Sequence, residues 1–284
     1  ANTGACAPRR SLRTSLSASF VMLAMSAFGV ASCDGDPVPE VGDVACDNLD
    51  ETNCVFPFPS DYFRKDGGTN GLLFDREGRL LACEPVQRRV TRTETDGTIK
   101  VLTDSYEGKK YNQPNDITVD SKGRIYFSDP RYGDRSGMEQ RDEKGQTIEG
   151  VYRIDLDGKV TRVLGREVDR ANGVLVTPDD KYLYVADNNN DTEGGKRCLW
   201  RFELKDGAVD AASKKMIYDW GKSRGPDGVK QDVDGRLYVA GGVNKPNKHE
   251  TDEQKGGIYV FSPSGEKIAF IAVPTDEVTN CAFG

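Results

Sequence analysis

A short motif centred on an Asn or Asp constrains the fold of this chain more than any other feature. Its central residue returns at intervals of 45, 57, 55 and 53 residues along the sequence. Self-similarity at such a period is typical of repeat architectures, in which each unit is one supersecondary block. The five occurrences are Thr69-Asn70-Gly71, Pro114-Asn115-Asp116, Ala171-Asn172-Gly173, Pro226-Asp227-Gly228 and Thr279-Asn280-Cys281.

The sequence after each of the first four motifs alternates apolar and polar residues on both sides of a tight turn. These stretches are LLFDREGRLLAC, ITVDSKGRIYFSD, VLVTPDDKYLYVAD and VKQDVDGRLYVAG. A second alternating pair follows in each unit, although LWRFELKDGAVDAASKKMIY in the third has a longer and looser return. Glycine accepts the positive φ of such turns, so the pattern favours hairpins. Four strands per repeat of about 40–55 residues predict an all-β chain built of β-propeller blades; a solenoid of hairpins is the alternative.

The central residues of the five motifs are candidates for a site at the mouth of the propeller channel. The first strand of each blade lines that channel, so residues just before these strands converge. All five carry a short oxygen-bearing side chain, and a ring of amide and carboxylate oxygens suits a hard cation such as calcium. Turn capping before a strand is the alternative for each of them. The five are Asn70, Asn115, Asn172, Asp227 and Asn280.

Several spaced motifs resemble the gluconolactonase and senescence-marker-protein family of six-bladed, calcium-dependent β-propellers. The resemblance covers residues 69–284, and its motifs agree in their order along the chain. It implies a calcium ion at the channel mouth and hydrolysis of sugar-acid or related lactones, with Zn²⁺, Mn²⁺ and Mg²⁺ as alternative ions. The motifs are YNQPNDITVDSKG (111–123), SDPRYG (128–133), ANGVLVTPDDKYLYVAD (171–187), GPDG (225–228) and TNCAFG (279–284).

The same resemblance implies roles for single residues. Asn172 and Asp227 match the metal-binding Asn and Asp of the family, and Asp227 would also take a proton from the attacking water. Asn115 matches a residue that contacts metal-bound water or substrate, so it is both a metal and a catalytic candidate. Gln113 stands where some members carry a substrate-contacting Arg, so the identity of the lactone does not carry over. The other candidates for substrate binding are Asp129, Tyr132, Asn70 and Asn280.

One family feature is missing from this sequence. Family members begin with a blade that carries Glu-Gly-Pro, whose Glu completes the metal site, and no segment here matches it. We count four blades and the start of another, so we expect a propeller that is incomplete at both ends. Its calcium affinity should be reduced, because ligand charge drives the binding of hard cations. Residues 56–64 or Glu84 are candidate substitutes.

Residues 1–33 have the pattern of a bacterial export leader. Arg9, Arg10 and Arg13 precede an apolar run over residues 16–32, which is shorter than the roughly 20 residues that a membrane span needs. Cys33 after Val-Ala-Ser resembles the lipidated cysteine of bacterial lipoproteins. The leader therefore predicts an exported, periplasmic protein held in the cell envelope by a lipid anchor. A buried helix or a short membrane span is the alternative.

Residues 34–68 have the composition of a tether between this leader and the propeller. Pro, Asp and Glu are frequent, and neither helical nor strand periodicity persists. Cys46 and Cys54 form a disulfide or remain thiols, because their spacing fits both. Three further cysteines, far apart in sequence, are expected to be buried as small apolar residues. They are Cys83, Cys198 and Cys281.

Charge and the missing blade set the remaining functional alternatives. A net charge of −7 argues against nucleic-acid binding, which needs a basic face. We expect a monomer that acts on a small lactone and contacts the membrane only through its lipid. The alternatives are a non-catalytic envelope propeller that binds protein or carbohydrate, an inactive fragment, and a related propeller that hydrolyses organophosphate esters.

Overall fold

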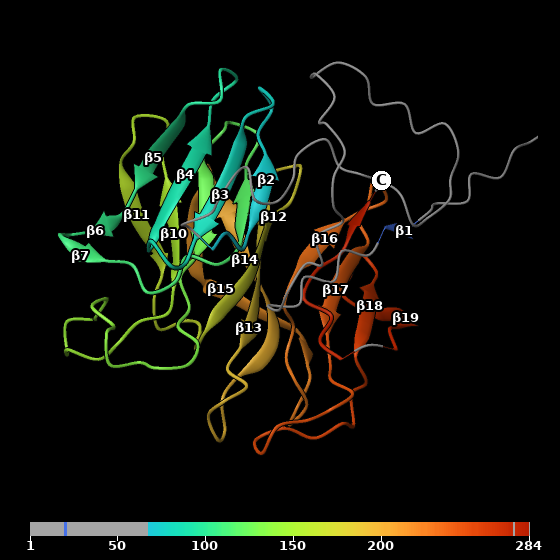
Figure 1. Cartoon of the computed structure of the whole chain (residues 1–284). Helices are drawn as coiled ribbons and strands as arrows, with labels where there is room; N and C mark the ends of the chain where they lie inside the picture. Colours follow the sequence, from blue (N-terminus) through green and yellow to red (C-terminus); the bar gives the residue numbers. More distant parts are fainter. Residues whose placement is uncertain (1–19, 22–67, 275, 284) are drawn as a thin grey trace, which may run out of the picture.

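The computed structural model describes residues 20–21, 68–274 and 276–283, and these residues form an all-β structure. Four antiparallel sheets of four strands each follow one another along the chain, coloured from cyan to red in Figure 1. In each sheet, strands that are consecutive in sequence are hydrogen-bonded neighbours. Among the described residues no helix is long and apolar enough to cross a membrane. The predicted fold class, about four propeller blades and part of another, is confirmed.

The four sheets correspond to the four sequence units. The first contains β2 (Leu72–Phe74), β3 (Leu80–Glu84), β4 (Arg89–Thr93) and β5 (Ile99–Thr103). The second contains β8 (Ile117–Val119), β9 (Ile125–Ser128), β10 (Val151–Ile154) and β11 (Val160–Leu164). The third contains β12 (Ala171–Val176), β13 (Tyr182–Asn188), β14 (Arg197–Lys205) and β15 (Ala208–Asp219). The fourth contains β16 (Val229–Gln231), β17 (Leu237–Gly241), β18 (Gly257–Phe261) and β19 (Lys267–Ala272).

The described residues also form two short two-stranded sheets. One joins β6 (Ser105–Tyr106) to β7 (Lys109–Lys110). The other joins β1 (Phe20–Val21) to β20 (Ala282–Phe283), the strand that follows the fifth motif. Apart from β1 and Gly68, the predicted leader and tether, with Cys33, Cys46 and Cys54, lie outside the described residues. Their export, lipidation and disulfide chemistry stay predictions.

The first hairpin of three of the four blades closes through the same local chemistry. Between β2 and β3, Oδ1 of Asp75 accepts the backbone N–H groups of Glu77 and Arg79, at 3.1 and 2.9 Å. Nε of Arg79 bonds Oδ2 of Asp75 at 2.8 Å, and Gly78 takes a φ of 74°. The Asp-x-x-Gly-Arg pattern thus determines turn and strand register together. It recurs as Asp120, Gly123 and Arg124, and as Asp232, Gly235 and Arg236.

The outer hairpin of the third blade is the longest, as its sequence predicts. Positive φ angles at Asp206 (51°) and Gly207 (76°) close a two-residue turn between β14 and β15. Register shifts along this pair accommodate the extra residues as bulges. The looser return suggested by the sequence is therefore a continuous pair of strands with local irregularities.

Adjacent sheets pack against each other through apolar side chains. Val174 and Leu183 of the third sheet share a buried cluster with Tyr126 of the second. Val229 of the fourth sheet is buried with Leu199 of the third. The inner strands β2, β8, β12 and β16 lie beside one another in that order. Radial packing of this kind brings the loops before the inner strands to one end of the molecule.

Candidate functional site

The five repeated motifs meet, in sequence order, at the ends of the inner strands. The backbone N–H of Gly71 donates to the carbonyl of Asn115 at 2.6 Å. Oδ2 of Asp116 then accepts the N–H of Val174 at 3.0 Å, which ties the second motif to the third. The N–H of Gly228 donates to the carbonyl of Thr279 at 2.8 Å. Hydrogen bonds thus join the first motif to the second, the second to the third and the fourth to the fifth, and Gly173 of the third motif lies against the carbonyl of Asp227 in the fourth.

Asn172 and Asp227 form a pair at this end of the molecule. Asn172 is buried, and no donor among the described residues reaches its Oδ1. Burial, followed by the negative charge of Asp116, raises the pKa of Asp227 to about 8. The positive charge of Arg224 and a hydrogen bond from the Asn172 side chain act in the lowering direction. A carboxyl that titrates near neutral pH beside an unpaired buried oxygen is suited to proton transfer or to cation binding.

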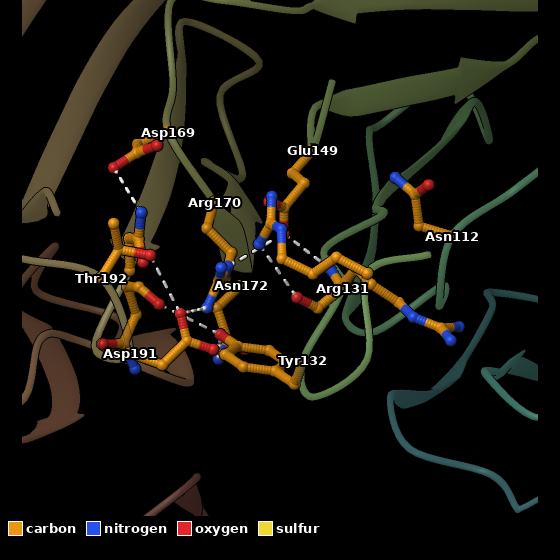
Figure 2. Close-up of polar contacts among 12 residues, drawn as sticks. Asn112, Arg131, Tyr132, Glu149, Asp169, Arg170, Asn172, Asp191 and Thr192 are labelled. Atoms are coloured by element: carbon orange, nitrogen blue, oxygen red, sulfur yellow. Dashed lines mark hydrogen bonds and ion pairs between the residues drawn. The ribbon is translucent and has the colours of Figure 1, made fainter. Parts of the chain in front are cut away.

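Tyr132 holds the Asn172 amide from another side. Nδ2 of Asn172 donates to Oη of Tyr132 at 2.8 Å (Figure 2). The Tyr132 hydroxyl donates in turn to the carbonyl of Asn188 at 3.3 Å. Burial and the nearby Asp227 charge raise the pKa of Tyr132 well above its usual value, so its hydroxyl stays protonated. Oδ1 of Asn188 accepts the N–H of Gly225 at 3.1 Å, which links Tyr132 to the loop before Asp227.

A buried ion pair lies against the Tyr132 ring. Cζ of Arg170, a fully buried residue, is 5.1 Å from the ring centroid. Nε of Arg170 bonds Oε2 of Glu149 at 2.9 Å, and Nη1 pairs with Oδ1 of Asp191 at 2.8 Å (Figure 2). The same Glu149 oxygen accepts the backbone N–H of Arg131 at 2.7 Å. One carboxylate therefore fixes both the guanidinium and the backbone next to Tyr132.

The predicted substrate residues Gln113 and Asp129 lie on two hydrogen-bonded loops, Gln113 before β8 and Asp129 after β9. Asp129 is buried, and its two oxygens accept the backbone N–H groups of Asn112 and Gln113 at 2.8 and 2.9 Å. Burial raises the pKa of Asp129 to about 8 against the lowering effect of these two donors. Oε1 of Gln113 accepts the backbone N–H of Tyr132 at 2.9 Å. The loop before β8 is thereby joined to the segment that carries Asp129 and Tyr132.

The other three predicted ring residues have different surroundings. Asn115 is half-buried, and its backbone N–H donates to the carbonyl of Ser128 at 2.9 Å. Asn70 is exposed at the start of the first blade. Oδ1 of Asn280 accepts the N–H of Cys281 at 2.9 Å, the turn-capping contact that was the alternative for these residues. Of the five side chains, the structure places Asn172 and Asp227 in mutual contact.

Glu84, the candidate replacement for the missing glutamate, uses its carboxylate oxygens for hydrogen bonds within the first sheet. Its Oε2 bonds Nε of Arg89 at 2.6 Å, and its Oε1 accepts the Thr91 hydroxyl at 2.7 Å. The other candidate, residues 56–64, lies outside the described residues. Within the described ranges no group of three or more His, Cys, Asp and Glu side chains is arranged to hold a metal ion. The predicted buried thiols are present: Cys83, Cys198 and Cys281 are free and buried.

Four side chains of this site were not predicted from the sequence. The sequence contained one indication that Asp116 is unusual, because three other repeats have glycine at the equivalent position after the motif centre. Glu149 and Arg170 are 21 residues apart and belong to different loops, so no local pattern links them. The four are Asp116, Glu149, Arg170 and Asn188.

Comparison with known families identifies the family of this chain. The model of the SMP-30/Gluconolactonase/LRE-like region matches residues 44–284. The chain belongs to this family. Within the family it is similar to a gluconolactonase of Zymomonas mobilis, with 28% identity over 236 residues. That match covers 80% of this chain and 61% of the relative. A lactonase, drp35, of Staphylococcus haemolyticus is 26% identical, covering 72% of this chain and 69% of its own length.

Solved structures of the family share the fold. A gluconolactonase of Xanthomonas campestris superposes with a TM-score of 0.59 at 30% identity, covering 76% of this chain and 66% of its own. A luciferin-regenerating enzyme superposes with a TM-score of 0.54 at 19% identity, covering 76% of this chain and 66% of its own, which is a likeness of fold. The chain thus spans less than two thirds of the Zymomonas and Xanthomonas proteins.

Proposed function

We propose that this chain is a lactone hydrolase that opens sugar-acid or related lactones. The observation that carries the proposal is the contact between Asn172 and Asp227 where the repeated motifs meet. Family membership and the similarity to gluconolactonases and lactonases support the same chemistry. Because the chain spans 61% of the Zymomonas relative, activity of this chain itself has to be measured.

We propose that the hydrolase depends on calcium. The fit rests on Oδ1 of Asn172, a buried oxygen with no donor among the described residues, and on the carboxyl of Asp227, which the same amide contacts through its nitrogen. Buried polar atoms are normally satisfied, so an unpaired amide oxygen on a side chain that contacts a carboxyl group suits an oxygen-preferring cation. Asn172 and Asp227, with Asn115 as the further candidate, would hold the ion. When bound, calcium would supply Lewis-acid polarisation of the lactone carbonyl.

The residues of the chain supply the proton chemistry. Asp227 would accept a proton from water as the water oxygen attacks the lactone carbonyl carbon. The ring C–O bond then breaks, and the leaving oxygen takes that proton from Asp227 to become the hydroxyl of the hydroxy acid. Asn115 and Gln113, which the family resemblance implies as site residues, would bind the lactone through their amides.

The decisive experiment replaces Asp227. Asp227→Ala should remove calcium-dependent hydrolysis across a panel of sugar lactones, with a loss of at least about 100-fold if Asp227 acts as the base. Asp234→Ala, in an exposed turn of the same blade, is the matched control and should keep activity. Full activity in a folded Asp227→Ala variant would overturn the assignment. Calcium binding without hydrolysis of lactones or organophosphate esters would favour the non-catalytic binding propeller.

From the leader alone we further propose an exported protein that is anchored in the bacterial envelope by lipid on Cys33. Metabolic labelling with palmitate should mark the wild-type chain and not a Cys33→Ala variant. Equal labelling of both would contradict the anchor.

A further inference from the structure

Both hydrogen-bonding functions of the Tyr132 hydroxyl are used inside the site. The carbonyl of Asn188 is an acceptor only, so the hydroxyl gives its single proton to that carbonyl at 3.3 Å. The Tyr132 oxygen is then left with lone pairs. These accept an N–H of Asn172 Nδ2 at 2.8 Å.

This pattern determines which way the Asn172 amide faces. Turned over, the amide would place Oδ1 against an oxygen whose proton is already donated elsewhere, so the hydrogen-bond network selects the observed orientation. In that orientation Oδ1 is buried and has no donor among the described residues. The same side chain contacts Asp227. Oδ1 of Asn172 therefore carries no hydrogen bond from the described residues, and it belongs to the same amide whose nitrogen faces the Asp227 carboxyl.

Arg170 and Glu149 fix the position of Tyr132. The planar guanidinium of Arg170 lies over its ring with Cζ 5.1 Å from the centroid (Figure 2). Oε2 of Glu149 fixes Arg170 and also accepts the N–H of Arg131, the residue before Tyr132. Arg170 is completely buried, so this brace is part of the interior and not a surface ion pair.

We propose that Tyr132, braced by Arg170 and Glu149, is a positioning residue that presents Oδ1 of Asn172 to a cation held together with Asp227. The inference rests on the proposed cation site and adds a supporting layer of residues to it. Tyr132 acts through Asn172 and does not contact the ion, a role that differs from the substrate contact expected from the sequence.

The first test measures calcium affinity of the full chain by isothermal titration with calcium chloride. Tyr132→Phe keeps the ring and removes the acceptor for Asn172. We expect calcium binding to weaken by about 10–100-fold, the usual effect of losing a partner that orients a metal ligand. Tyr218→Phe is the matched control, because its hydroxyl bonds Gln254 and not Asn172. Thermal unfolding in EDTA verifies that each variant is folded.

The second test separates orientation from packing. An aspartate at position 172 has two equivalent oxygens, so its affinity for calcium should not depend on which oxygen faces the ion. Adding Tyr132→Phe to Asn172→Asp should therefore change calcium affinity by less than about threefold, as a double-mutant cycle would reveal. A purely structural Tyr132 would produce the same loss in both backgrounds.

A loss of calcium affinity on Tyr132→Phe that occurs with Asn172 present, and not with Asn172→Asp, supports the proposal. An unchanged affinity in Tyr132→Phe, or an equal loss in both backgrounds, overturns the positioning role and leaves the proposed hydrolase intact. Absence of calcium binding by the wild-type chain overturns both this role and calcium dependence, and lactone hydrolysis measured in EDTA then shows whether the hydrolase itself survives.

Discussion

At the scale of single residues, Asp129 is a predicted site residue whose carboxyl oxygens face the backbone. The sequence indicated it as a site residue because it lies in the SDPRYG motif. In the structure its two oxygens hold the N–H groups of Asn112 and Gln113, so it shapes the loop that carries Gln113. That arrangement could not be read from the sequence, because Asp129 and Gln113 are 16 residues apart.

Asp129 makes stability depend on pH in a defined direction. Its folded-state pKa is about 8, above the unfolded value of about 3.9. Between these values the folded state keeps a proton that the unfolded state has released, so stability falls as pH rises through the window. The slope for one carboxyl is at most about 1.4 kcal/mol per pH unit. Asp129→Asn should therefore flatten the decline in unfolding free energy from about pH 5 to about pH 8.

Urea denaturation with EDTA present measures this slope. Asp96→Asn is the control, because Asp96 is exposed and hydrogen bonding to Thr98 lowers its pKa, which puts its titration below the window. An unchanged slope in Asp129→Asn would mean that the two backbone donors keep this carboxyl ionised throughout.

At the scale of elements, the hairpins and the convergence of the inner loops were predictable, and the individual contacts between these loops were not. The Asp-x-x-Gly-Arg turns use atoms within five residues of one another, so the chemistry that closes them is visible in the sequence. The glycines after the motif centres allow the neighbouring loops to approach each other closely. A Cβ at Gly173 would overlap the carbonyl oxygen of Asp227, and this demand comes from the neighbouring blade. Glycine is required there because two backbones approach closely.

Gly173→Ala tests this close approach. The added methyl group has to push the third and fourth inner loops apart, so we expect a loss of about 1–3 kcal/mol in unfolding free energy and weaker calcium binding. Gly137→Ala is the matched control, since no atom lies within 4 Å of its Cβ position. Chemical denaturation and calcium titration measure both effects. Equal stability of the two variants would contradict the close-packed loop contact.

At the scale of the whole molecule, ion binding should couple to folding. The proposed ligands Asn172 and Asp227 belong to different blades, so they are brought together only in the folded chain. A ligand that binds only the folded state stabilises it by about 2.7 kcal/mol at 100 times its dissociation constant. For a chain of this size that corresponds to a rise in Tm of roughly 5–10 °C.

Calcium should therefore raise the Tm of the wild-type chain, and EDTA should reverse the rise. Asp227→Ala should lose the effect, because the ion would lose its carboxylate ligand. Differential scanning calorimetry provides the measurement, and Asp234→Ala is again the control. A full calcium-induced shift in Asp227→Ala would place the ion elsewhere.

The sequence by itself determined the repeat, the four-stranded blades and the family, and it predicted Asn172 and Asp227 as the pair at the site. The repeat follows from motifs spaced 45 to 57 residues apart, and the strands and turns follow from alternation and turn chemistry within a few residues. Only the tertiary structure decided that Asn280 caps its own turn and that Glu84 bonds Arg89 and Thr91 within its own sheet. The hydrogen bond by which Tyr132 orients Asn172 was likewise visible only in the tertiary structure. Tyr132 and Asn172 are 40 residues apart, and the Glu149–Arg170 pair behind them spans 21. Such contacts arise from the packing of one blade against the next, which no local pattern records.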